Sequence, residues 1–253
     1  MKIGLMDSGM GGLTVLKELW RHHSDHEYYY YADSDNAPYG TKTPELVTEL
    51  TEKAVATLVA CGVEVIIIAC NTATIAAANG LRTKYDIPII GMLPEIADAI
   101  AAAGPNKRVL VTATKLTLTQ PTVLNLVREL DGAAQVDMIQ LSELVAFAEA
   151  GQFGAPEPRA LLKEKFAHIN PKTYGSIILG CTHFPLFKPL FEEIFPEDVE
   201  YIDGAKQTRF RLEEILSAPS DNPGITFFVS GTLVTAGPRY DLIQKIINME
   251  GDL

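Results

Sequence analysis

The sequence predicts an α/β protein of two similar, mostly parallel α/β domains, related by pseudo-two-fold symmetry, with a site in the cleft between them. Short apolar runs alternate with longer helical stretches, which is typical of βαβ units on a parallel sheet. The alternation occurs twice along the 253 residues, and a cysteine closes an apolar run in each half. Ligands bind beyond the carboxyl ends of parallel strands, so both cysteines are expected at a functional edge.

Nine short β-like runs predict the strands. In chain order they are Lys2–Met6, Glu27–Ala32, Val63–Ala69, Pro88–Met92, Arg108–Thr112, Ala134–Ile139, Ser176–Gly180, Glu200–Asp203 and Ile225–Val229. The longer stretches between them predict helices over Leu13–Arg21, Pro44–Ala60, Thr74–Tyr85, Pro121–Glu129, Ser142–Gly151, Pro158–Ile169 and Arg239–Met249. Because strands and helices alternate, mostly parallel pairing is expected.

Two features recur at a similar spacing and indicate an internal duplication. The run Lys2–Asp7 has a counterpart in Arg108–Ala113, and the apolar run before Cys70 has a counterpart before Cys181. Two similar halves related by a pseudo-two-fold axis would bring the two cysteines face to face across the cleft.

Domain boundaries are expected in two segments, Gly91–Pro94 and Asp203–Thr208. The first domain would then comprise residues 1–93 together with 207–253. The second domain would comprise residues 94–206, so the final segment of the chain returns to the first half.

Composition excludes several classes of protein. With 47% hydrophobic and 21% charged residues, the chain can bury a large core. The formal net charge of −11 repels polyanions, which argues against non-specific binding to nucleic acid or to an anionic membrane. The N-terminus lacks a signal-peptide pattern, and no run approaches the ~18 apolar residues of a membrane helix, so we expect a cytoplasmic protein. Three cysteines do not suggest a disulfide framework.

The matched cysteines, Cys70 and Cys181, are the strongest chemical signal. Small polar residues that can begin a helix follow each one, and a helix N-terminus lowers a thiol pKa below its usual value of about 8.5. One thiolate can remove a proton from a carbon while the opposite thiol donates one, which inverts that carbon. A single cysteine is more often a small buried apolar residue, and Cys61 fits that interpretation.

A glycine-rich turn follows the first predicted strand. Asp7 and Ser8 supply a carboxylate and a hydroxyl, and the glycines within residues 9–12 let backbone amides approach an anionic group. The same turn, with Asp33 closing the second strand, imitates a dinucleotide-binding fingerprint. Thr14 replaces the third glycine, however, and the Asp7 charge stands where a pyrophosphate would approach. The pattern therefore favours a site without a nucleotide.

Two further motifs lie at the same expected edge of the sheets. Pro38, Tyr39 and Gly40 form either a plain turn or part of the site opening. Thr182 and His183 directly follow the second matched cysteine, and a histidine two positions from a thiol can tune it or relay its proton.

No metal site is predicted. His22, His23 and His26 cluster after a predicted helix, but their spacing lacks a partner carboxylate or cysteine group. We expect these three histidines to form a solvated helix end.

Four motifs in this order resemble those of glutamate racemases, in the cofactor-independent aspartate/glutamate racemase superfamily. They are Asp7–Gly9, Pro38–Gly40, Cys70–Ala73 and Gly180–Pro185. The resemblance implies two α/β domains with the site between them, and no pyridoxal phosphate or other cofactor. It implies interconversion of L-glutamate and D-glutamate, which supplies peptidoglycan synthesis and so cell-wall formation and cell shape. It also implies a small-molecule partner, glutamate, and allows a homodimer.

The resemblance assigns roles residue by residue. Cys70 and Cys181 would be the two acid/base residues, Cys70 for the D-enantiomer and Cys181 for the L-enantiomer, with Asp7 and His183 assisting the nearby thiols. The positions that would hold the amino acid are Asp7, Ser8, Pro38, Tyr39, Gly40, Asn71, Thr72, Thr114, Thr117, Thr182 and His183. Asp33 and Glu149 match further acidic positions of the family.

The chain departs from the family pattern in two segments. Thr114 and Thr117 are kept, but residues 118–121 replace a serine and a tyrosine that usually follow, and residues 141–144 lack a common Cys-Pro. Both threonines would help to bind a carboxylate, so this region bears on which acid fits.

Three alternatives stay open on the sequence alone. The nearest is a racemase of aspartate or another amino acid, since aspartate is one methylene shorter and such a difference is worth only about 1–3 kcal/mol in a pocket. The others are a nucleotide-dependent oxidoreductase and a non-catalytic amino-acid-binding protein.

Overall fold

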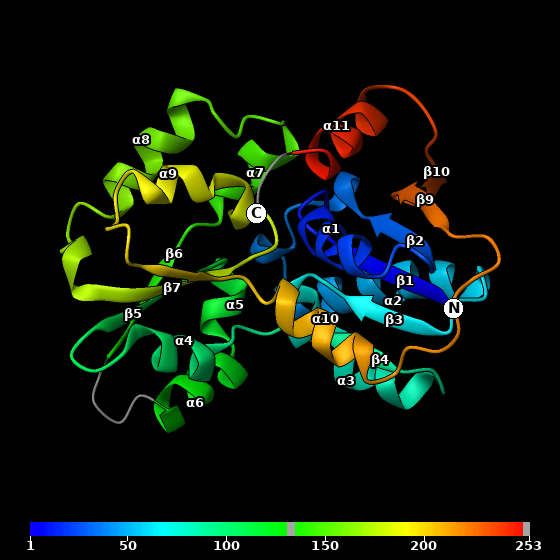
Figure 1. Cartoon of the computed structure of the whole chain (residues 1–253), viewed down its shortest axis with the longest axis horizontal. Coiled ribbons are helices and arrows are strands. Elements are labelled where there is room, and N and C mark those ends of the chain that lie inside the picture. The colour runs from blue at the N-terminus through cyan, green and yellow to red at the C-terminus, as the bar shows by residue number, and fades with distance from the viewer. Residues whose placement is uncertain (131–134, 250–253) are drawn as a thin grey trace.

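Two sheets lie side by side, each covered by helices (Figure 1). The structure is a computed structural model that describes residues 1–130 and 135–249. The first sheet has the strand order β10-β9-β2-β1-β3-β4, and the second has the order β6-β5-β7-β8. All neighbouring strands pair in parallel except β9 and β10, which pair antiparallel.

The strands of the first sheet come from both ends of the chain. They are β1 (Lys2–Asp7), β2 (Glu27–Ala32), β3 (Val65–Ile68), β4 (Ile89–Gly91), β9 (Gly224–Val229) and β10 (Thr232–Leu233). The second sheet is formed by the middle of the chain. Its strands are β5 (Arg108–Ala113), β6 (Val136–Gln140), β7 (Tyr174–Gly180) and β8 (Glu200–Ile202).

Helices connect the strands as crossovers. The α-helices are α1 (Leu13–His22), α2 (Pro44–Ala60), α3 (Asn71–Lys84), α4 (Ile96–Ala103), α5 (Lys115–Thr119), α6 (Pro121–Leu130), α7 (Glu143–Glu149), α8 (Pro156–Lys165), α9 (Lys188–Glu192), α10 (Ala205–Glu213) and α11 (Pro238–Ile247). Short 3-10 turns are η1 (Ser34–Asn36), η2 (Tyr39–Thr41), η3 (Pro171–Thr173) and η4 (Phe184–Phe187).

The strand order repeats between the sheets. β2-β1-β3-β4 in the first sheet has the same order and parallel sense as β6-β5-β7-β8 in the second. Each cysteine follows the third strand of its repeat, β3 or β7. The duplicated α/β fold expected from the sequence is therefore confirmed.

All nine expected strands are present, and the differences concern short or polar elements. Residue 134, the expected start of the sixth strand, lies outside the described residues. Helices α4, α5, α9 and α10 and the two-residue strand β10 were not among the expected elements. β9 and β10 pair in the first sheet, and α10 spans the expected boundary at residues 206 and 207. The domain boundaries themselves stay a prediction.

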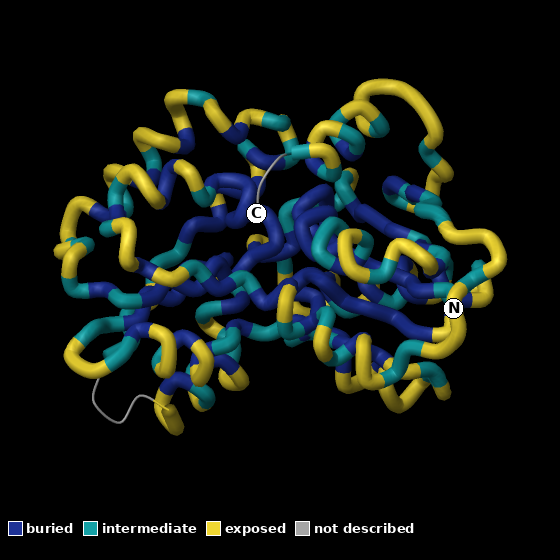
Figure 2. Tube along the Cα trace, in the orientation of Figure 1, coloured by how far each residue is buried: buried dark blue, intermediate teal, exposed yellow. Residues whose placement is uncertain are grey.

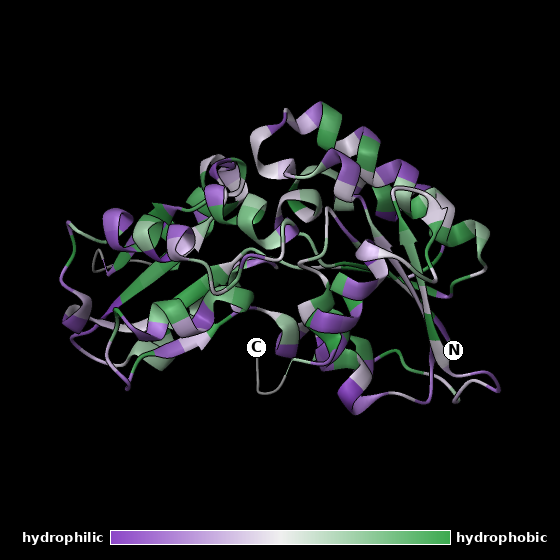
Figure 3. Ribbon diagram, turned by 90° about the horizontal axis from the view of Figure 1, so that it is seen from above, coloured by the Kyte–Doolittle hydropathy of each residue, from purple (hydrophilic) through white to green (hydrophobic). Residues whose placement is uncertain are grey.

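Alternating side chains along the strands of the second sheet pack on opposite faces, as the two-residue period of a strand requires. Val109, Val111 and Ile178 belong to one apolar cluster with α4 and α6. Leu110 and Ile177 belong to another, which contains α8 and α9 residues. Figure 2 shows buried chain through both sheets, and Figure 3 shows apolar residues on the strands with polar ones on outer turns of the helices.

Among the described residues, no helix combines the length and the apolar character needed to cross a membrane. The net negative charge also led us to expect that the protein surface does not bind anionic membranes. This expectation stays a prediction.

Phe191 tests the packing of the second domain. Its ring is fully buried on α9, with the ring centroid of Phe166 at 5.7 Å. We expect Phe191→Ala to lower the free energy of unfolding by about 3–5 kcal/mol, because the cavity cannot refill. Phe210→Ala is the matched control: this ring is 46% exposed and lies over Arg209, so we expect a loss under about 1 kcal/mol. Equal losses of unfolding free energy in urea for Phe191→Ala and Phe210→Ala would contradict the described packing of Phe191.

Candidate active site

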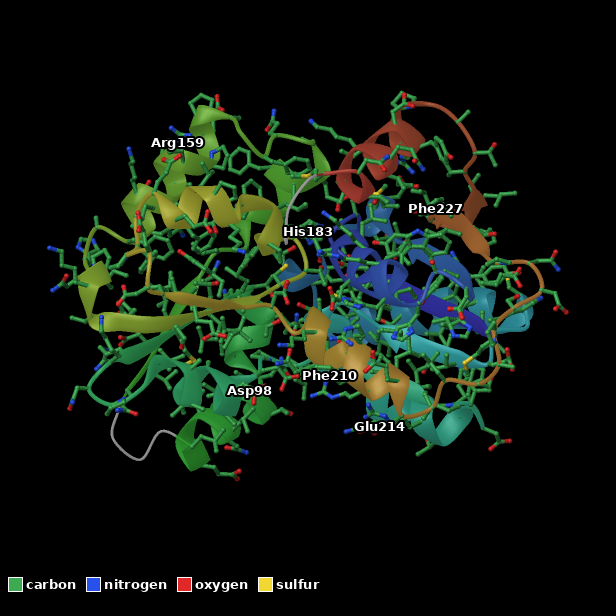
Figure 4. All side chains as sticks on the ribbon, viewed as in Figure 1. Asp98, Arg159, His183, Phe210, Glu214 and Phe227 are labelled. Atoms are coloured by element: carbon green, nitrogen blue, oxygen red, sulfur yellow. The ribbon has the colours of Figure 1, made fainter. Side chains whose placement is uncertain are left out.

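The site lies where the carboxyl ends of the two sheets meet. Asp7 is the last residue of β1, and Thr114 follows β5 as the N-cap of α5. Cys70 is the N-cap of α3 after β3, and Cys181 directly follows β7. Figure 4 shows His183 between the two sheets. The repeated topology therefore brings polar ends of both sheets to one place.

Cys70 is buried, with 6% of its surface exposed. Its thiol donates a hydrogen bond to Ser8 Oγ at 3.5 Å, and the Ala73 N–H donates to its sulfur at 3.4 Å. Burial, together with the charges of Asp7 and Cys181, raises its pKa to about 12, against the lowering effect of both hydrogen bonds. The expectation of a lowered thiol pKa at this helix N-terminus is wrong for Cys70, because burial raises the pKa by more than the helix N-terminus lowers it.

Cys181 has a different surrounding, although it is also buried, with 8% of its surface exposed. Its sulfur lies 3.6 Å from Nδ1 of His183, and Nε2 of that ring lies 2.6 Å from Oε1 of Glu149. A carboxylate only accepts hydrogen bonds, so the short contact assigns a proton to Nε2. The backbone N–H of Gly11, 3.2 Å from Nε2, then approaches that atom without donating to it.

His183 is held in its charged form. Burial lowers its pKa, but hydrogen bonds and charge interactions with Cys181 and Glu149 outweigh burial and raise the pKa well above 6.5. The imidazolium lies directly beside the Cys181 sulfur.

Glu149 connects the two halves of the site. Its Oε1 accepts hydrogen bonds from His183 and from the Met10 N–H, and its Oε2 accepts one from the Ser34 hydroxyl at 2.9 Å. Burial alone would raise the pKa of Glu149, but His183, the Met10 amide and Ser34 together lower it. The carboxylate is thus ionised opposite an imidazolium.

Asp7 makes a second connection between the halves. Its carboxylate accepts hydrogen bonds from the Gly9 N–H and from the Thr182 hydroxyl, both at 3.0 Å. Its side chain is fully buried, and burial raises its pKa despite the opposing charge of His183.

Three buried threonines meet across the cleft. The hydroxyl of Thr72, on α3, lies 3.0 Å from those of Thr114 and Thr117, which are 3.1 Å from each other. Beside this hydroxyl cluster, Nδ2 of the buried Asn71 has no hydrogen-bond partner among the described residues. A buried amide rarely stays unpaired, so this donor indicates a position for a ligand acceptor.

Asp33 orients Tyr39. Its carboxylate accepts a hydrogen bond from the Tyr39 hydroxyl at 2.6 Å and others from the Asn36 amide. Pro38 precedes Tyr39, and Gly40 packs so closely on Thr114 that a side chain at Gly40 would collide with it.

The structure gathers the expected residues where the carboxyl ends of the two sheets meet. They are Asp7, Ser8, Asp33, Pro38, Tyr39, Gly40, Cys70, Asn71, Thr72, Thr114, Thr117, Glu149, Cys181, Thr182 and His183. Their roles toward a substrate stay predictions. Sequence reasoning missed Ser34 and the Met10 amide, and a hydroxyl residue directly after Asp33 was the signal for the first.

The histidines after α1 were only partly understood from the sequence. His22 and His23 lie near Glu18 and Glu213 respectively, at the end of α1. His26 contradicts the expectation of a solvated end: it is 3% exposed, and burial lowers its pKa. It directly precedes β2, an internal strand of the first sheet.

Comparison with known proteins identifies the class of enzyme. Residues 3–208 match the family described as Asp/Glu/Hydantoin racemase, and the chain belongs to this family. It is therefore an isomerase of the racemase class.

Within the family, the chain is similar to proteins named glutamate racemase. One from Campylobacter curvus is 42% identical over 222 residues, which are 86% of this chain and 84% of the relative. The crystal structure of glutamate racemase from Campylobacter jejuni has a TM-score of 0.80 at 27% identity, covering 97% of this chain and 96% of that one. The structure from Francisella tularensis in complex with D-glutamate has a TM-score of 0.80 at 25% identity, covering 98% and 94%.

Gly11 tests how tightly the two halves of the site pack. A methyl group there would lie 2.5 Å from Nδ1 of His183 and 2.6 Å from Oγ1 of Thr182. We expect Gly11→Ala to lower the free energy of unfolding by about 1–3 kcal/mol. Gly80→Ala is the control, since nothing lies within 4 Å of a methyl there. On helix α3 it should instead stabilise by up to about 1 kcal/mol. Wild-type stability of Gly11→Ala in urea would disprove the close approach.

Proposed function

We propose that the chain interconverts L-glutamate and D-glutamate by moving the α-proton between two cysteine thiols. The observation that carries this proposal is the pair Cys70 and Cys181, which are buried at equivalent strand ends and close enough for the charge of Cys181 to raise the pKa of Cys70. The substrate is supported by the relatives named glutamate racemase and by the neighbour crystallised with D-glutamate.

The resting protonation fits reaction from the L-enantiomer. We assign the base role to Cys181, whose sulfur lies 3.6 Å from Nδ1 of His183. The thiolate would take the α-proton of L-glutamate, and the C–H electron pair would stay on the carbon. Cys70, whose pKa of about 12 keeps it a thiol, would then give its proton to the opposite face. The product is D-glutamate, with Cys70 left as the thiolate and Cys181 as the thiol.

Reaction from the D-enantiomer needs the opposite distribution. Cys70 must then lose its proton first, at a position where burial and the Asp7 charge both oppose a thiolate. The ammonium group of a bound amino acid would supply the missing positive charge, since an opposite charge within ~4–6 Å favours ionisation. We therefore infer that substrate binding itself activates Cys70.

Hydrogen-bond donors would hold the two carboxylates of glutamate. The Thr72, Thr114 and Thr117 hydroxyls and the unpaired Asn71 amide can orient an anion without supplying a competing base. One fewer methylene would move the far carboxylate of aspartate out of register with such a set, so we propose glutamate as the preferred substrate.

The alternatives are less well supported. The glycine turn that imitates a dinucleotide fingerprint is packed against Glu149 and His183, and added atoms at Gly9 or Gly11 would collide with them. We further propose, on the resemblance to glutamate racemases, that D-glutamate serves peptidoglycan synthesis and that the enzyme is cytoplasmic. A homodimer and the absence of a cofactor stay predictions of the same resemblance.

Circular dichroism of L-glutamate solutions tests the activity. With reduced enzyme and no added cofactor, the signal should decay to zero, and the α-hydrogen should exchange with solvent deuterium. We expect Cys70→Ser and Cys181→Ser to lower the rate at least about 100-fold, as for loss of an acid/base group. Cys61→Ser is the matched control and should keep the wild-type rate, since Cys61 lies at the end of α2, outside the site.

Other outcomes would change the proposal in defined ways. Decay with L-aspartate but not with L-glutamate would keep the chemistry and replace the substrate. Binding of glutamate without decay would indicate a binding protein. Full activity in either Cys70→Ser or Cys181→Ser would rule out the two-thiol mechanism.

A further inference from the structure

Ser34 contacts Glu149 from the opposite side of the cleft. Ser34 begins η1, after β2 of the first sheet, whereas Glu149 ends α7 beside the second. The Ser34 hydroxyl donates to Oε2 at 2.9 Å. The other oxygen, Oε1, is the one that accepts from His183 Nε2. The two carboxylate oxygens therefore face different partners on different sheets.

We propose that Ser34 is a positioning residue for the reaction: its hydroxyl holds the Glu149 carboxylate across the cleft, so that Oε1 stays aligned with His183 and the imidazolium stays beside Cys181. The inference rests on the proposed function for its role in turnover. The linked groups then run from Ser34 through Glu149 and His183 to the Cys181 sulfur.

The position of Ser34 is set independently of its hydroxyl. The Asp33 N–H donates to the backbone oxygen of Asp7 at 3.0 Å, and the Ala37 N–H donates to the backbone oxygen of Ser34. The Asp35 N–H donates to the hydroxyl of Ser230 at 3.0 Å. The backbone hydrogen bonds of Asp33 and Ala37 thus hold η1 in place, and the Ser34 hydroxyl is directed to the carboxylate.

The groups around Glu149 determine how loss of the Ser34 hydroxyl would change the pKa values of Glu149 and His183. His183 faces it from the start of η4, and Tyr30 faces it from β2; His183 in turn faces Asp7 and Cys181. Without the Ser34 donor, the carboxylate anion is less stabilised, so the pKa of Glu149 should rise. A Glu149 carboxylate that is less often ionised, or that has moved away from His183, stabilises the imidazolium less, so the pKa of His183 should fall.

The first test compares three variants by kcat/KM for L-glutamate against pH. Ser34→Ala should lower kcat/KM about tenfold near neutral pH, the size expected for a hydrogen bond to a charged group. The pH range of high kcat/KM should also become narrower. The acid limb should move to higher pH because the pKa of Glu149 rises, and the basic limb should move to lower pH because the pKa of His183 falls. Ser34→Thr keeps a hydroxyl at this position, so both limbs of its profile should stay at the wild-type pH.

Ser230→Ala is the matched control, because it removes a hydrogen bond to the same short helix without touching Glu149. It should leave the pH profile at the wild-type position. A wild-type profile for Ser34→Ala, or the same narrowing in Ser230→Ala, would overturn the proposal.

A second test does not depend on activity. In the full-length protein labelled with ¹⁵N-histidine, the His183 signals are assigned by their loss in His183→Asn, and their titration is followed by NMR. The His183 midpoint should move to lower pH in Ser34→Ala and stay in place in Ser34→Thr and Ser230→Ala. An unchanged midpoint in Ser34→Ala would refute the link. If the wild type does not racemise glutamate, the proposed function fails, and this titration alone decides whether Ser34 holds the pair.

Discussion

The buried ion pair between Glu149 and His183 is the interaction on which the rest of the site depends. It joins α7 to the start of η4, and the Met10 amide and Ser34 bring the first sheet onto it. A buried ion pair is stable only where further hydrogen bonds complete it. The glycine turn after β1 exists in this form because any side chain at its closest points would displace the pair.

The repeated topology creates two equivalent places, and local partners make them chemically different. Both thiols follow the third strand of a four-strand repeat. Cys70 faces a hydroxyl, an amide and a buried carboxylate, whereas Cys181 faces an imidazolium. The first surrounding retains the proton of the Cys70 thiol, whereas the second places a cation beside the Cys181 sulfur. On the proposed function, the repeated fold thereby holds two thiols in different surroundings, one for each face of the carbon that is inverted.

Much of the fold was predictable because strongly apolar strands and long helices carry periodic patterns. The missed helices are short or polar: α4 has eight residues, α5 and α9 have five each, and α10 is largely polar. The matched cysteines were found through local sequence. The Ser34 contact with Glu149 was not, because it joins positions 115 apart in sequence. The raised pKa of Cys70 also escaped prediction, since burial is a property of the assembled cleft and not of the helix that the cysteine caps.

The cluster of Thr72, Thr114 and Thr117 has a thermodynamic consequence for ligand affinity. Each hydroxyl has one proton to donate, and the three oxygens already lie within hydrogen-bond distance of one another. On the proposed function, an incoming carboxylate would compete with these mutual hydrogen bonds for the hydroxyl protons. Its net gain is the difference between two sets of hydrogen bonds. On the proposed function, the hydrogen bonds among the three hydroxyls would therefore weaken their hold on substrate and product alike, which favours rapid release over tight binding.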